Sequence, residues 1–210
     1  MGKLRSGILG HLSGKVAGVV GSRWKDKSTL REYVIPANPD TDPQKAQRSK
    51  MRIGVAMMKG LVGQIFNEYV DKFQKSMSGF NYALSQNMAC FLAPITVEDI
   101  SICWGQLWPV TAPTATYVTP NVVCAWGSND YGNNGAATDK IYACVYDIST
   151  GRWYFAGAEV ARSTVGITVP CEAGLSEANL FAYVLAAKYS PTSPTLLEMV
   201  SNSAYCIVGD

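Results

Sequence analysis

The stretch KIYACVYDISTGRWYFAGAEV, residues 140–160, carries the clearest structural signal in the sequence. Its first half alternates between two sets of side chains, which are Ile141, Ala143 and Val145 against Tyr142, Cys144 and Tyr146. A period of two is typical of a β-strand, because successive side chains point to opposite faces. Ser149-Thr150-Gly151 interrupts the pattern before a second β-prone run. We therefore predict a β-hairpin with one of the two sets turned toward a core.

The rest of residues 96–210 has the same character. The region contains seven short β-rich runs with Gly, Asn, Asp and Pro between them. Besides the two runs of the hairpin, they are ISICWGQ, NVVCAW, VGITVP, NLFAYVLAAK and SAYCIV. Regularly spaced short strands are typical of an antiparallel sandwich. We predict an immunoglobulin- or fibronectin-like β-sandwich over residues 96–210, with NLFAYVLAAK as a strand.

A helical segment is expected before it, over residues 41–95. Thr41-Asp42-Pro43-Gln44 matches a capping box, with proline tolerated in the first turn. An apolar stripe then recurs at steps of three and four, through Met51, Val55, Met58, Val62, Ile65, Tyr69 and Phe73. We interpret this stripe as a packing face. A second helix is predicted in GFNYALSQNMACFLA, after Ser78. The fold class is therefore α+β.

Residues 1–40 read as a glycine-rich basic arm followed by a β-hairpin. Two β-prone runs, VAGVVGSRW and TLREYVI, are separated by KDKS and predict a ribbon over Val16–Ile35. Such a ribbon is marginal alone and needs a partner surface. Gly14, Gly18 and Gly21 would let another backbone approach closely.

The Gly-Lys pair at positions 14 and 15 does not form a phosphate-binding loop. Leu9 stands where the first glycine of that motif should be, and Val16 stands where the magnesium-binding hydroxyl should be. We expect the glycines to serve close packing of the arm and not phosphate binding.

The charge is divided unevenly along the chain. Residues 1–80 contain fourteen Lys/Arg and six Asp/Glu, a net charge of +8, whereas residues 81–210 contain four and ten, a net charge of −6. A basic amino-terminal part can meet either nucleic acid or the acidic part of a neighbouring copy, since the electrostatic logic is the same. The sequence leaves both partners open.

Cysteine usage indicates synthesis in a reducing compartment. The six cysteines are dispersed, with no C-x₂-C pair and one histidine, His11, so neither a zinc site nor a cofactor is expected. Cys103, Cys124, Cys144 and Cys206 lie in apolar runs and are interpreted as small buried hydrophobes. We find no run of 18 or more apolar residues, and we expect no membrane partner.

Several separated motifs carry a resemblance to a known family. SGKVAGVVGSRWK, Arg31, NPDTDPQKAQRSKM and GFNYALSQN occur in this order over residues 7–90. They resemble an uncharacterised bacterial family that bears a domain-of-unknown-function label. Its amino-terminal signature is similar to that of structural proteins of bacteriophages and prophages. The resemblance implies a virion or assembly protein, made in the bacterial cytoplasm, and brings no catalytic residues.

From these features we expect a non-enzymatic structural subunit, most simply a capsid-, neck- or tail-associated phage protein that forms homo-oligomers. Its docking region would lie in the arm, the hairpin and the start of the helix. The candidate docking residues are Lys15, Gly18, Gly21, Arg23, Trp24, Arg31, Gln44, Gln47 and Arg48.

Three other classes remain open. The first is a glycan- or surface-binding sandwich that uses Trp104, Trp108, Tyr117, Trp126 and Tyr131. The second is contact with a packaged genome through Lys15, Arg23, Lys25, Lys27 and Arg31. An enzyme is the least expected class, because the chain has one histidine and its acidic residues after position 81 are scattered.

Overall fold

The computed structural model describes residues 2–4, 13–24, 27–35, 37, 40–74, 76–91, 95–127 and 131–209. The chain divides into two compact units, Met1–Asp42 and Pro43–Asp210, and each is described by itself. Lys25 and His11 lie outside the described residues.

The first unit is a four-stranded antiparallel sheet in the order β1-β4-β3-β2. Its strands are β1 (Gly2–Leu4), β2 (Gly14–Val16), β3 (Val19–Trp24) and β4 (Lys27–Glu32). The predicted pairing of the two β-prone runs is confirmed between β3 and β4. The first run is not one strand, however, because a turn at Ala17 and Gly18 separates β2 from β3. Ala17 adopts a φ of 50° in this turn, and the backbone N–H of Tyr33 donates to the carbonyl oxygen of Gly18 at 2.8 Å.

The second unit begins with a helical layer. It consists of α1 (Asp42–Lys59), a π-helix η1 (Val62–Val70) and α2 (Gly79–Asn87), followed by the 3₁₀ turn η2 (Val97–Asp99). The predicted helix start at Thr41-Asp42 is confirmed. Ser78 caps α2, since its hydroxyl accepts the N–H of Asn81.

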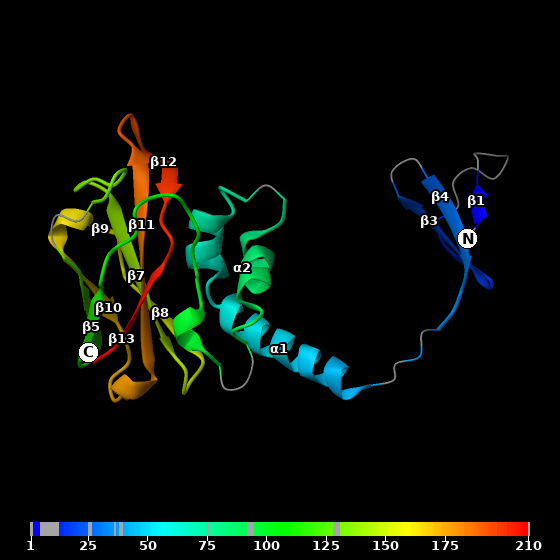
Figure 1. Ribbon diagram of the computed structural model, residues 1–210, viewed down its shortest axis with the longest axis horizontal. Coiled ribbons are helices and arrows are strands. Elements are labelled where there is room, and N and C mark those ends of the chain that lie inside the picture. The colour runs from blue at the N-terminus through cyan, green and yellow to red at the C-terminus, as the bar shows by residue number, and fades with distance from the viewer. Residues whose placement is uncertain are drawn as a thin grey trace. The chain divides into compact units, whose positions relative to one another are not determined.

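The predicted apolar stripe is only partly a packing face. Met58, Ile65 and Tyr69 are buried, whereas Met51, Val55 and Phe73 are exposed. Two causes are visible. The amino-terminal part of α1 extends beyond the other elements of the unit (Figure 1), and a turn at Gly60 ends α1 before η1 begins.

Two antiparallel sheets follow. The three-stranded sheet has the order β10-β6-β5, and the six-stranded sheet has the order β12-β11-β7-β8, with β13 paired to β11 and β9 to β7. The strands are β5 (Thr114–Val118), β6 (Asn121–Ala125), β7 (Lys140–Asp147), β8 (Arg152–Phe155), β9 (Val160–Ala161), β10 (Gly166–Pro170), β11 (Leu180–Ser190), β12 (Ser193–Val200) and β13 (Ala204–Ile207). Short 3₁₀ turns, η3 (Arg162–Thr164) and η4 (Glu177–Asn179), lie between strands.

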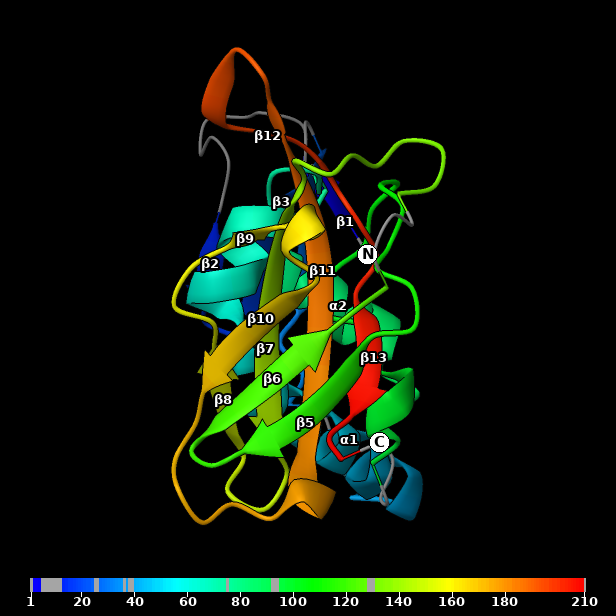
Figure 2. The same ribbon diagram turned by 90° about the vertical axis from the view of Figure 1, so that its left-hand side faces the viewer.

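The two sheets are joined along one edge. A parallel bridge links Val208, just after β13, to Ala115 on β5, while β10 on the far side contacts β7 and β8. The strands therefore curl into a half-barrel (Figure 2). The α+β class and the antiparallel β7–β8 hairpin and β11 strand are confirmed, but the part of the chain that the structure describes has no immunoglobulin- or fibronectin-like sandwich.

Strand β7 is buried on both faces, although alternation led us to expect one buried set. Tyr142 faces the helical layer, since its ring lies 6.0 Å from the ring of Tyr69 and its hydroxyl donates to Gln64. Ile141, Ala143 and Val145 are also fully or almost fully buried, on the face toward the three-stranded sheet. Figure 1 shows helices on one side of β7 and β11 and β5 and β10 on the other. A strand covered on both faces loses the polar half of its pattern.

The cysteine side chains behave as small apolar groups. Cys103, Cys124, Cys144 and Cys206 are buried as predicted, Cys90 and Cys171 are half-buried, and all six are free thiols. Whether they stay reduced in the native protein is a prediction that alkylation can test.

Candidate docking surface

The described side chains of the first unit form almost no core. Among them, Gly21 and Ser28 alone are buried. A sheet of this size without a buried apolar face is marginally stable in water. A covering surface outside the sheet would therefore add to its stability.

Apolar side chains of this unit are exposed. The exposed fraction is 54% for Val16, 66% for Val34 and 77% for Ile35, and Val19 and Tyr33 are exposed as well. Scattered apolar residues are ordinary on protein surfaces, but these five all fall within one stretch of twenty residues, 16–35, in a small unit. They are the strongest sign of an interaction surface in the unit.

Cations accompany the apolar residues. Lys15, Val20 and Arg31 form one row across β2, β3 and β4, since Lys15 pairs with Val20 and Val20 with Arg31. The Lys15 ammonium lies 3.5 Å from the centroid of the Tyr33 ring. An open hollow of about 530 Å³ is lined by Val20, Arg31, Glu32, Tyr33 and Val34.

The structure thus brings together Lys15 and Arg31 of the predicted docking set. Gly21 is buried opposite Gly14 in the β2–β3 pair, and Gly18 lies in the turn beside β3. Close packing of these glycines against a neighbour stays a prediction. Arg23 and Trp24 pair with Ser28 and Lys27, and their side chains lie outside the described part of the chain.

The other three predicted residues belong to the second unit. Gln44, Gln47 and Arg48 are exposed in the first two turns of α1. They form a separate surface, on a helix and not on the sheet.

The aromatic residues considered for glycan binding have different roles. Trp126 is a core residue, because it is buried and its indole N–H donates to the carbonyl oxygen of Arg162 at 2.9 Å. The Tyr117 hydroxyl donates to the carbonyl oxygen of Glu172. Trp108 and Tyr131 both border Arg162, whose guanidinium donates to the Trp108 carbonyl oxygen and lies 5.7 Å from the Tyr131 ring.

Trp104 lines a cavity with other aromatic and polar groups. This cavity has a volume of about 300 Å³, and Phe73, Gln106, Glu198 and Met199 share its wall. The ring of Tyr82 packs edge-on against Trp104 with 5.2 Å between the centroids.

The sequence analysis missed a half-buried carboxylate, Glu159, with two tyrosine partners. Glu159 Oε1 accepts hydrogen bonds from the hydroxyls of Tyr69 and Tyr189, the latter at 2.6 Å. Burial first, and then the Glu159 carboxylate, raise the pKa of both tyrosines, so both stay protonated donors. Glu159 also borders an open cavity of about 470 Å³ with Lys140 and Lys188. Tyr69, Glu159 and Tyr189 are far apart in sequence, so no local sequence pattern predicts that they interact.

A second buried polar group holds the loops before β7. Arg162 is 3% exposed, and its guanidinium donates to the carbonyl oxygens of Trp108 and Pro109 at 2.9 and 2.8 Å and lies 4.0 Å from Asp139. Burial raises the pKa of Asp139, while the Ala136 N–H, Lys188 and Arg162 act in the opposite direction. This pair organises loops.

Two structural features that bear on function are absent from the described residues. Among the described residues, no group of three or more His, Cys, Asp or Glu side chains is placed to hold a metal ion. No described helix combines the length and the apolar character that crossing a bilayer requires.

The fold defines a class of protein in which a small four-stranded sheet unit precedes an α+β domain of curled antiparallel sheets. The chain belongs to a family of unknown function, DUF6266, whose model matches residues 11–188. The match extends into β11, well beyond the amino-terminal motifs that carried the resemblance, and it contains no link to bacteriophages. No curated protein and no solved structure matches the chain.

Proposed function

We propose that this protein is a non-enzymatic structural subunit that joins a larger assembly, made of its own copies with other assembly proteins, through the first unit. One observation carries the proposal. Val16 and Val19 of the sheet and Tyr33, Val34 and Ile35 just after β4 are exposed, while Gly21 and Ser28 alone are buried among the described side chains of this unit. Covering these side chains with a second copy removes apolar area from water, which stabilises both the sheet and the contact.

Charge supports a second copy as the occupant. Residues 1–80 carry a net charge of +8 and residues 81–210 a net charge of −6, so contacts between the amino-terminal part of one copy and the β-rich part of the next are favourable. Contacts of this head-to-tail kind generate rings or filaments.

A bacteriophage particle, assembled in the bacterial cytoplasm, is the setting that the amino-terminal motifs suggest. That part of the proposal rests on likeness of SGKVAGVVGSRWK and NPDTDPQKAQRSKM alone. Electron microscopy of the native assembly tests it, and a particle with no virion proteins contradicts it.

Sedimentation velocity tests the assembly role. We expect the full chain to form oligomers and the V34S/I35S variant to dissociate, since it removes the two most exposed apolar side chains of the unit. The matched control is L196S, which removes an apolar side chain that is 59% exposed on β12 in the second unit. A full chain that stays monomeric over its whole soluble range, or equal dissociation by L196S, contradicts the proposal.

A glycan-binding module remains the second candidate, now centred on the cavity of Trp104, Phe73, Gln106 and Glu198. Aromatic faces beside a carboxylate and an amide are groups that sugars contact. Tryptophan fluorescence titrated with a glycan panel tests it, and a response that persists in W104F removes Trp104 from the site.

A further inference from the structure

Helix α1 (Asp42–Lys59) is strongly basic. Lys45, Arg48, Lys50, Arg52 and Lys59 are opposed within the helix by Asp42 alone, so five positive charges less one negative charge leave +4. Residues 43–67 contain no acidic residue at all.

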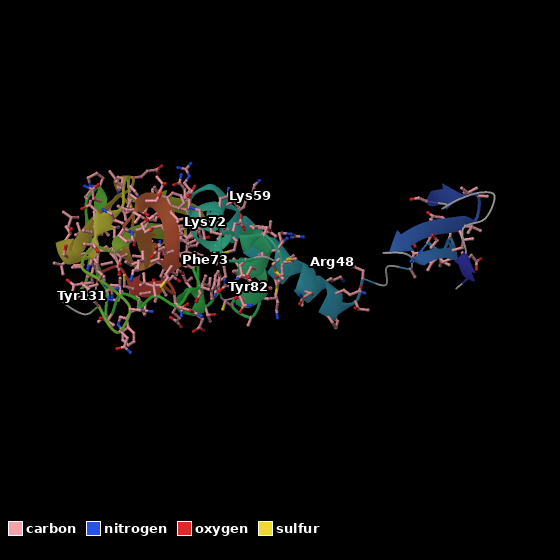
Figure 3. All side chains as sticks on the ribbon, turned by 90° about the horizontal axis from the view of Figure 1, so that it is seen from above. Arg48, Lys59, Lys72, Phe73, Tyr82 and Tyr131 are labelled. Atoms are coloured by element: carbon pink, nitrogen blue, oxygen red, sulfur yellow. The ribbon has the colours of Figure 1, made fainter. Side chains whose placement is uncertain are left out.

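Four of these cations lie on one face. Lys45, Arg48, Arg52 and Lys59 follow each other at steps of three, four and seven, which places them within about 60° of the helix circumference and along about 21 Å of its axis. We call these four residues the basic stripe. Arg48 and Lys59 are labelled on α1 in Figure 3.

The basic stripe points away from the packed side of the helix. Gly54, Met57 and Met58 are buried on the opposite side, and a Cβ at Gly54 would lie 2.5 Å from the ring of Phe91. The carbonyl oxygen of Met57 accepts a hydrogen bond from the indole of Trp153. The carboxyl-terminal half of α1 is therefore anchored, and the orientation of the stripe is set by the core.

The amino-terminal half of α1 is exposed on all sides. Residues 42–49 are exposed without exception, a length of about 12 Å, and Figure 1 shows this part extending beyond the other elements of the second unit. A bare helix of this width fits the major groove of B-form DNA. Gln44 borders the face of the basic stripe and adds an amide group, which can hydrogen-bond base edges, whereas Gln47 lies on another side of the helix.

We propose that α1 binds duplex nucleic acid, with the basic stripe contacting phosphates. An acidic protein is the competing partner, but the stripe lacks the apolar centre that protein interfaces use, since Val55 and Ala56 flank its arc about 20° outside the two edges and no apolar residue lies within it. A nucleic-acid backbone binds best to a surface whose cations are not interspersed with carboxylates, because carboxylates repel phosphates. Residues 43–67 contain cations and no acidic residue. Duplex binding by this helix does not use the cations of the first unit, but α1 contributes +4 of the net charge of +8 on residues 1–80 that also favours the assembly role.

Fluorescence anisotropy of a labelled mixed-sequence DNA duplex, titrated with the full chain at several salt concentrations, tests the proposal. The test variant is K45Q/R48Q/R52Q. The matched control, K72Q/K140Q/R152Q, removes the same charge from exposed cations elsewhere in the second unit. We expect the test variant to lose about tenfold or more in affinity and its salt slope to fall by up to about 2.7, whereas the control retains both.

A duplex RNA of equal length, run alongside, separates two modes of binding. Preference for DNA indicates entry of α1 into the major groove, and equal binding indicates phosphate contacts alone, so both support the proposal. Absence of duplex binding at low salt, an unchanged slope in the test variant, or equal losses in test and control would overturn it. Salt-sensitive self-association that K45Q/R48Q/R52Q abolishes, without duplex binding, would assign the stripe to the acidic part of a second copy.

Discussion

The indole nitrogen of Trp153, on β8, donates a 2.8 Å hydrogen bond to the carbonyl oxygen of Met57, near the end of α1. Gly60 permits this contact, because a Cβ there would lie 2.6 Å from the indole ring. The backbone N–H of Leu61 bonds to the Met58 carbonyl oxygen at this point, so the helix ends where the tryptophan enters. One residue of the hairpin thereby holds the helix that carries the basic stripe.

Replacing Trp153 with phenylalanine should lower the free energy of unfolding by about 1 kcal/mol or more, since the Met57 carbonyl oxygen loses its partner. Urea denaturation measures the change. Tyr154→Phe is the control, because the Tyr154 hydroxyl is buried without a hydrogen-bond partner among the described residues. Its removal should be neutral or stabilising, and an equal loss in both variants would mean that the hydrogen bond is not the cause.

Arg162→Met should cost about 3 to 5 kcal/mol, because it leaves Asp139 and two loop carbonyl oxygens buried without their cation. Arg152→Met removes an exposed arginine that pairs with Glu172, and its cost should stay below about 1 kcal/mol. Thermal unfolding of both variants compares the two sites. Similar melting temperatures would refute a structural role for the buried pair.

Asp147 should stabilise the β7–β8 turn in a pH-dependent way. Burial raises its pKa, but hydrogen bonds from Ser149 and Thr150 outweigh burial and hold the pKa below the unfolded value of 3.8. A folded pKa below the unfolded one gives stability that is complete above pH 3.8 and is lost as the pH falls through the folded pKa. Asp147→Asn should therefore cost about 2 kcal/mol at neutral pH, with the gap to the unmodified chain closing below pH 3.8. A gap that stays constant on acidification would exclude this carboxylate as its source.

Gly18→Val should impair assembly while leaving both units folded. No described atom lies within 4 Å of a Cβ added at Gly18, so the valine meets no obstacle within the chain, and any effect reports a neighbour. Lys15→Ala should matter less and cost about 0.5 to 1 kcal/mol, since it removes an exposed contact with Tyr33. Size-exclusion chromatography with circular dichroism of each variant decides the matter; an unchanged elution profile for Gly18→Val would show that no neighbour packs against the turn. We expect neither the unmodified protein nor the Lys15→Ala variant to bind ATP or GTP. Nucleotide affinity of the unmodified protein that Lys15→Ala abolishes would instead support a phosphate-binding loop.

All six thiols should be alkylated after denaturation without reductant. In the native protein we expect Cys90 and Cys171 to react first, because they are half-buried while the other four are buried. Burial raises the pKa of Cys171 to about 11, so its rate of alkylation should still be rising with pH at pH 9. Mass spectrometry of the labelled protein identifies the sites, and a stoichiometric disulfide would contradict the reducing compartment.

Local patterns predicted the elements that depend on neighbouring residues. The turn at Ser149-Thr150-Gly151, the helix start at Thr41-Asp42 and the β11 strand within NLFAYVLAAK each lie where the sequence places them. Periodicity, capping and turn chemistry act over a few residues, which is why the sequence alone determines them.

Tertiary structure decided which surfaces pack against those elements. The helical layer covers one face of β7 and the three-stranded sheet the other, so Tyr142 and Ile141 are both buried. Met51 and Val55 obey the same period as Met58 but are exposed, because the described elements of the second unit pack against the side of α1 that carries Gly54, Met57 and Met58. Glu159 accepts hydrogen bonds from Tyr69, which is ninety residues away in the sequence, and from Tyr189, which is thirty residues away. Burial depends on which distant surfaces come together, and pairings at such separations leave no period in the sequence.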